Sequence, residues 1–126
     1  TGDAVLRWNL LALDLAESSE QPAARRWRKS LHNNLGWTYF DLGELDKAME
    51  HFKLSRSFAE QMGDAESERI ARWCMARALR EQGHYSEAMA MQMAIQAELE
   101  RLGQTDEFCD QEIAELEKVL ADQPKT

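Results

Sequence analysis

Three histidines, His32, His51 and His84, are the side chains of this 126-residue chain best suited to proton transfer near neutral pH. A histidine takes part in nucleophilic catalysis when a carboxylate or a thiol lies within hydrogen-bonding reach. None of the three has such a group at a spacing that forms a triad, although folding could still bring distant residues together. We interpret all three as helix-surface or turn residues, and we predict neither an enzyme nor a bound cofactor.

Sulfur-containing side chains suggest a second kind of chemistry, the binding of soft metal ions. Met89, Met91 and Met93 alternate along the chain, but on a helix residues 89 and 93 share one face while residue 91 points elsewhere. Cys74 and Cys109 stand alone, without a C-x-x-C pair or a histidine at ligand spacing. We therefore predict no metal site, and we expect the methionines to pack between helices and the thiols to be buried and reduced.

The chain has a formal charge of −8, and much of the excess acid lies in residues 105–126. Nucleic-acid binding requires a surplus of lysine and arginine on one surface, so we predict no nucleic-acid partner. A basic run, Arg25, Arg26, Arg28 and Lys29, spreads its charges around a helix and is interpreted as a solvated surface rather than an anion-binding patch. No apolar run approaches the ~20 residues that span a bilayer, so we expect no membrane association and a cytoplasmic location.

The sequence repeats itself at a lag of forty residues. Five residues recur unchanged at that lag: Gly43 and Gly83, Ala48 and Ala88, Met49 and Met89, Glu60 and Glu100, and Gly63 and Gly103. Within each unit apolar residues return every three or four positions up to a glycine, which predicts two helices separated by a tight turn. A period of this length indicates a solenoid, in which one helix pair stacks on copies of itself.

The first unit resembles the tetratricopeptide repeat. The residues at the spacings of that family's signature are Leu35, Gly36, Tyr39, Gly43, Leu45, Ala48 and Phe52. The resemblance implies that small residues let two helices approach closely, at Gly36 with its counterpart Ala76 and at Ala48 with Ala88. The unit is forty residues long where the family has about 34, lacks the closing proline and has Ser55 where alanine is usual. The additional residues predict helix pairs longer by roughly 9 Å.

The fold class that follows is all-α, a right-handed α-solenoid of antiparallel helix pairs with about six helices, in a single domain over residues 1–126. Residues 4–17, with Asp3 as N-cap, are interpreted as the unpaired second helix of a preceding repeat. Residues 23–63 and 65–103 form two repeats, and residues 105–122 form a capping helix. The predicted helices are 4–17, 23–42, 44–62, 65–82, 84–102 and 106–121.

The lag of forty residues also aligns the first helices of successive units, and the resemblance assigns one of their faces to the inside of the solenoid. That face carries Arg26, Ser30, Asn33, Trp37 and Asp41, then Glu66, Ile70, Trp73, Arg77 and Glu81, and on the cap Asp106, Asp110, Ile113, Glu117 and Ala121. Tryptophan and arginine dominate binding energy at many interfaces, and an asparagine amide can hold a peptide backbone. We predict a peptide-binding groove formed by Asn33, Trp37, Trp73 and Arg77. Two alternatives stay open, in which Arg77 pairs with Glu117 and Trp73 belongs to the core.

The predicted function is a protein–protein interaction scaffold that binds a peptide segment of a partner protein in its concave groove. The basic residues with which related repeats clamp a carboxylate are not reproduced, because Ser30, Ile70 and Cys74 stand in their places. An alternative is a structural or self-association module that forms a homodimer or part of a longer repeat array. In that case Trp8 and Leu11 on the first helix supply the apolar contact, since exposed apolar patches mark interaction sites.

Overall fold

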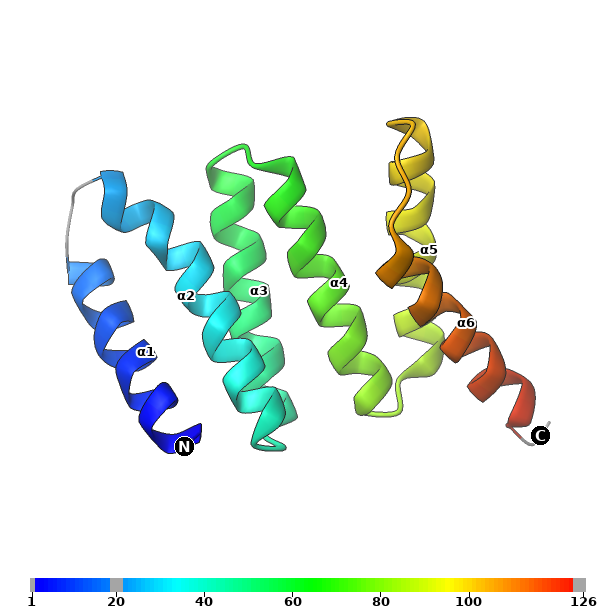
Figure 1. The fold of residues 1–126 in the computed structure, drawn as a ribbon, viewed down its shortest axis with the longest axis horizontal. Helices are drawn as coiled ribbons and strands as arrows, with labels where there is room; N and C mark the ends of the chain where they lie inside the picture. The colour runs from blue at the N-terminus through cyan, green and yellow to red at the C-terminus, as the bar shows by residue number, and fades with distance from the viewer. Residues whose placement is uncertain (1, 19–21, 124–126) are drawn as a thin grey trace. The chain divides into compact units, whose positions relative to one another are not determined.

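A computed structural model describes the backbone of residues 2–18 and 22–123 and the side chains of residues 2–15 and 30–123. Within those ranges the chain is all-α, without a strand (Figure 1). Its helices are α1 (Gly2–Ser18), α2 (Pro22–Asp41), α3 (Leu45–Gln61), α4 (Ala65–Glu81), α5 (Tyr85–Arg101) and α6 (Glu107–Asp122). Every predicted helix is confirmed, with boundaries that agree to within two residues, but α1 starts at Gly2 and Asp3 therefore lies in its first turn instead of capping it.

Four glycines at twenty-residue intervals, Gly43, Gly63, Gly83 and Gly103, follow the ends of α2, α3, α4 and α5. Their φ angles are 79°, 68°, 86° and 69°, in the left-handed region that a side chain disfavours. In the first turn the amide of Glu44 donates to the carbonyl of Tyr39 at 2.8 Å and the amide of Gly43 donates to that of Phe40 at 3.0 Å. These two bonds are the Schellman pattern of helix termination, and the other three turns repeat it.

The chain divides by its internal contacts into two compact units, residues 1–71 and 72–126, with the division inside α4. The single-domain organisation and the right-handed winding both stay predictions. In the first unit α2 packs against α1 on one side and against α3 on the other. In the second unit α5 packs against α6.

The core of the first unit is built around Phe52, whose ring is fully buried. Gly36 on α2 faces this ring so closely that a Cβ atom built there would lie 2.3 Å from the Cε1 atom of Phe52. The indole of Trp37 meets Phe52 edge-on, with ring centroids 5.1 Å apart. Leu35 and Ala48 are also fully buried, which agrees with the expectation that small residues let α2 and α3 approach closely.

The second unit buries the same positions of its repeat with different residues. Where α3 buries Ala48, Phe52, Ser55 and Ala59, α5 buries Ala88, Gln92, Ile95 and Leu99, each forty residues later. Ile95 and Leu99 form a core cluster with Cys109, against which Trp73 and Ile113 pack. Cys74 and Cys109 are both buried and unbridged, as predicted.

The methionines do not all pack between helices as predicted. Met49 and Met75 are buried, but Met62 and Met93 are exposed. Met62 follows the last residue of α3, where the chain leaves the helix for the Gly63 turn. Met93 lies one residue beyond the buried Gln92, and a step of 100° around α5 carries it away from the core.

Cys109 is expected to resist alkylation in the folded protein. Burial, together with the nearby carboxylates of Asp106, Asp110 and Glu112, raises the pKa of its thiol from 9.0 to about 11. Because the thiolate is the reactive form, its fraction at pH 8 falls about a hundredfold. Iodoacetamide labelling followed by peptide mass spectrometry should find Cys109 modified much more slowly in buffer than in urea.

The same pKa shift makes the free energy of unfolding depend on pH. Between pH 9 and pH 11 the folded state keeps the Cys109 proton that the unfolded state has lost, so stability present below pH 9 declines as the pH rises through 11. Thermal unfolding of a Cys109→Ala variant should show a smaller decline over that interval. Equal labelling rates in buffer and in urea would contradict both expectations.

Candidate functional site

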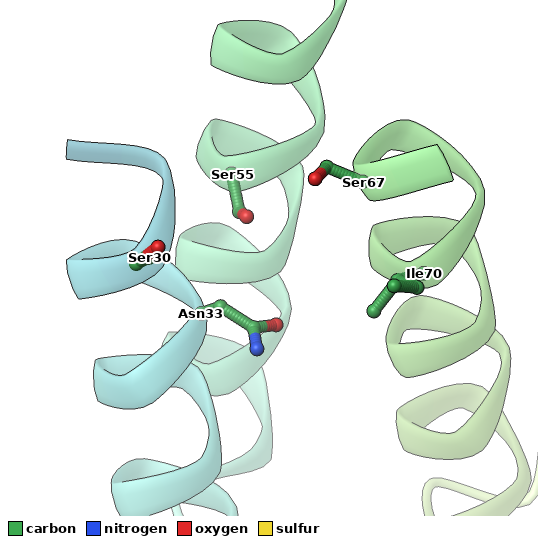
Figure 2. Close-up of a pocket in the computed structure, with 5 residues that line it drawn as sticks. All are labelled: Ser30, Asn33, Ser55, Ser67 and Ile70. Atoms are coloured by element: carbon green, nitrogen blue, oxygen red, sulfur yellow. The ribbon is translucent and has the colours of Figure 1, made fainter. Parts of the chain in front are cut away.

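A small cleft of about 150 Å³ lies in the first unit, between α2, α3 and the first turns of α4. Five residues line this cleft, which we call the Asn33 cleft: Ser30, Asn33, Ser55, Ser67 and Ile70. In Figure 2 the amide of Asn33 and the side chain of Ile70 point toward each other from α2 and α4, with Ser55 above them on α3. Ser30, Asn33 and Ile70 belong to the face that the forty-residue lag selected, and the structure brings them together.

Helix periodicity and a helix cap position these side chains. Ser30 and Asn33 are three residues apart on α2, as Ser67 and Ile70 are on α4, so each pair shares a face of its helix. Asp64, which precedes α4, accepts hydrogen bonds from the backbone amide of Ser67 at 3.0 Å and from its hydroxyl at 2.7 Å. The hydroxyl of Ser67 therefore presents oxygen lone pairs, because its proton is directed at Asp64.

The lining of the Asn33 cleft is polar and uncharged. Hydroxyl groups and a primary amide both donate and accept hydrogen bonds, and Ile70 adds an apolar wall that is half exposed. The alternating amide and carbonyl groups of a peptide main chain complement such a surface. No residue of the lining titrates near neutral pH, so this arrangement offers hydrogen bonding rather than proton transfer.

Trp37 follows Asn33 by one helical turn on α2, but its ring packs against the core of the first unit. Its ring is half-buried and meets both Phe40 and Phe52 edge-on, each at a centroid distance of 5.1 Å. The residues that line the Asn33 cleft do not include Trp37. A role for Trp37 in partner binding stays a prediction, and the contact with Phe52 gives the side chain a part in packing as well.

Trp73 lines a groove of about 390 Å³ between α4 and α6, in the second unit. We call it the Phe108 groove, and its lining consists of Trp73, Arg80, Phe108, Gln111, Glu112, Ala114 and Glu115. Trp73 is half-buried and also packs on the core cluster. The side chain therefore belongs both to the wall of the groove and to the edge of the core. Phe108, Gln111 and Glu115 were not predicted, although their spacing along the sequence places them on one face of α6.

Arg77 is held by two carboxylates of its own unit. Its guanidinium lies 2.9 Å from the carboxylate of Glu81 and 3.4 Å from that of Glu112. Arg80 reaches the same Glu112 at 2.8 Å, and the Glu112 side chain is only 7% exposed. The arginine thus joins α4 to α6 through Glu112, whereas the sequence suggested Glu117 as its partner.

Two of the histidines lie side by side, which corrects their interpretation as surface or turn residues. His32 is only 2% exposed, and its Nδ1 atom lies 3.0 Å from Nδ1 of His51. A hydrogen bond between these nitrogens requires one ring to donate and the other to accept. The rings also stack, with His51 against Tyr39 and His32 against Phe58. The pair fixes α2 against α3 in the core.

The first helix exposes an apolar stripe, as predicted for Trp8 and Leu11. Trp8 is 73% exposed and Leu11 54% exposed, and Val5 and Leu15 continue the stripe at helical spacing. Leu13, elsewhere on the same helix, is buried. Arg25, Arg26, Arg28 and Lys29 have side chains outside the described residues.

The described part of the chain has neither a metal-binding cluster nor a membrane-spanning helix. No cluster of three or more histidine, cysteine, aspartate or glutamate side chains could hold a metal ion there. No helix in the same ranges is long and apolar enough to cross a membrane.

Comparison with known proteins bears on the first unit. Residues 30–55, which run from α2 through the Gly43 turn into α3, match the family model described as Tetratricopeptide repeat. Neither the curated proteins nor the solved structures gave a match. The matched segment contains Gly36, Phe52 and the histidine pair, so it coincides with the packed α2–α3 contact. The family model thus matches one helix pair of the chain, and the helix pairs and the forty-residue recurrence agree with a tetratricopeptide-like helical repeat fold.

Proposed function

We propose that this protein is a non-catalytic interaction module that binds a peptide segment of a partner protein, and that the Asn33 cleft is one of its contact sites. The observation that supports the proposal is the convergence of Ser30, Asn33 and Ile70 with two further serines on one small cleft. A tetratricopeptide repeat carries interaction surfaces on its helices in general. We therefore assign one contact of that general role to the cleft.

The lining of the cleft favours an uncharged stretch of main chain as its ligand. A carboxylate would find no lysine or arginine among the lining residues, since Ser30 and Ile70 occupy places where related repeats carry basic side chains. An extended or helical segment that offers a main-chain amide or carbonyl to Asn33 and a small apolar side chain to Ile70 would satisfy both surfaces.

Replacing Asn33 with alanine is expected to weaken partner capture about five- to tenfold, which corresponds to the loss of one or two hydrogen bonds. The measurement is quantitative affinity capture from the source lysate, with partners identified by mass spectrometry. Asn34→Ala is the matched control, because Asn34 is an exposed asparagine next to Asn33 that does not line the cleft. Equal capture by both variants would remove the cleft from the proposal.

A second candidate function, self-association through α1, is favoured by the apolar stripe of Val5, Trp8, Leu11 and Leu15. Side chains of this size, aligned on one helix and turned toward solvent, gain free energy by packing against a second copy. In a dimer with two-fold symmetry, the stripe of one copy would pack against the same stripe of the other.

Replacing Leu11 with glutamate is expected to convert a dimer into a monomer without unfolding the helix, because the charge would be buried in the apolar contact. Sedimentation velocity measures the change. Leu10→Glu is the control, since Leu10 lies two residues from Trp8 and thus on the opposite side of α1. A wild-type chain that sediments as a monomer over the concentration range studied would rule out this function.

A further inference from the structure

The Phe108 groove in the second unit has aromatic walls on two helices. Phe108, near the start of α6, is 66% exposed, so most of its ring is accessible to a ligand. Trp73 from α4 provides the other wall, and it is held in place by its packing on the core cluster. The groove thus presents one fixed and one accessible aromatic ring.

The charges around the groove are predominantly negative. Along α6 the chain has six carboxylates, Glu107, Asp110, Glu112, Glu115, Glu117 and Asp122, against the single basic residue Lys118. The positive charge of Arg80 in the lining is matched by Glu112 at 2.8 Å. Glu115 adds a further carboxylate to the lining, half exposed and 3.7 Å from Lys118 across an exposed contact of little strength.

We propose that the Phe108 groove binds an arginine side chain of the partner segment. The proposal rests on the proposed function as a peptide-binding module and names the class of residue that its second unit selects. An arginine has an apolar stem that covers aromatic surface and a planar guanidinium that stacks on a ring while donating to a carboxylate. Phe108 and Trp73 supply the rings, and Glu115 supplies the carboxylate.

Other ligand classes fit this groove less well. An acidic side chain would meet Glu115 and the surplus carboxylates of α6, because Glu112 already pairs with the positive charge of Arg80. A purely apolar side chain would cover Phe108 but would make no interaction with the half-exposed carboxylate of Glu115. The combination of exposed aromatic surface with an adjacent carboxylate therefore favours a cation.

The test uses the full chain labelled with ¹⁵N and two blocked tripeptides, acetyl-Ala-Arg-Ala-amide and the same peptide with citrulline, the uncharged isostere of arginine. Titration by NMR at low ionic strength should shift the Trp73 indole signal and the backbone amides of Phe108 and Glu115. The arginine peptide is expected to bind at least threefold more tightly than the citrulline peptide, and added salt should reduce the difference.

Two variants locate the contact. Phe108→Ala and Glu115→Gln are each expected to weaken arginine binding about threefold, whereas Glu117→Gln, an exposed carboxylate on the same helix outside the groove, should leave it unchanged. Equal binding of the citrulline peptide, unchanged affinity in both groove variants, or no shift at these three residues would overturn the proposal. The readout is independent of partner capture through Asn33, so failure here leaves the proposed function standing.

Discussion

Replacing Gly36 with alanine is expected to destabilise the first unit by about 2 kcal/mol or more. The new Cβ atom would lie 2.3 Å from Cε1 and 2.5 Å from Cδ1 of Phe52, well inside contact distance. Alanine favours a helix over glycine by about 1 kcal/mol, but overpacking a rigid core costs about 1–3 kcal/mol, and this overlap is severe. Phe52 is fully buried and held edge-on by Trp37, so it has little room to move. The steric overlap with Phe52 should therefore outweigh the gain in helix propensity. Urea unfolding followed by circular dichroism measures the resulting loss of stability.

A second substitution identifies Phe52 as the obstacle. In the double variant Gly36→Ala with Phe52→Leu, the smaller side chain should accept the methyl group, so the double variant should be no less stable than Phe52→Leu alone. The chain already contains such a combination, because the positions forty residues later hold Ala76 and Gln92, both buried. A Gly36→Ala variant as stable as the wild type would show that the ring can be displaced at little cost.

Replacing Glu112 with leucine is expected to destabilise the second unit by about 2–3 kcal/mol. The carboxylate of Glu112 pairs with both Arg77 and Arg80, and its removal leaves two neighbouring guanidinium groups without that anion. Removing one partner of a fully buried ion pair costs about 3–5 kcal/mol, and a smaller loss applies here because both arginines keep about a fifth of their side-chain surface in contact with water.

The controls for Glu112 separate charge from hydrogen bonding. Glu112→Gln keeps one acceptor oxygen for the arginines and should lie between the wild type and Glu112→Leu. Glu117→Leu, at an exposed position of the same helix, should change stability by less than about 0.5 kcal/mol. Hydrogen exchange of the α6 amides localises the effect, which should appear as faster exchange throughout α6. Undiminished protection of α6 in Glu112→Leu would show that the apolar core alone fixes this helix.

The positions of the helices could be predicted from the sequence because helix ends depend on nearby glycines and on the local spacing of apolar residues. The turns at Gly43 and Gly83 have a left-handed backbone that glycine adopts without steric cost, so each glycine marks the end of its helix locally. The start of α1 was predicted less well, because Asp3 has the chemistry of an N-cap and the helix nevertheless includes it. The sequence also pointed to a repeat of forty residues, whereas the turns recur every twenty, since the two helices of each repeat differ in sequence but end in the same kind of glycine turn.

The residues of the candidate sites could be predicted from the sequence only in part. The repeat lag, helical geometry and the family resemblance together placed Ser30, Asn33 and Ile70 on one face, and of these only Asn33 was predicted as a site residue. Ser67 could not be found in that way, because its orientation depends on the hydrogen bonds with Asp64. The contact between His32 and His51 depends on how α2 is rotated and shifted against α3, which neither helix encodes by itself. Phe108 was overlooked for a different reason, since a large apolar ring is assigned to a core by default.

The equal spacing of the glycine turns has a consequence for how such a chain can change its length at the level of the gene. Residues 44–83 begin directly after one glycine turn and end with another, so a tandem copy inserted after Gly83 would place Glu44 where His84 now stands and preserve every junction. A deletion between the same two points is equally in frame with the helices. Unequal recombination between the two sequence repeats therefore yields longer or shorter proteins in which every glycine turn is preserved. Selection then acts only on the side chains at the new contacts between helices.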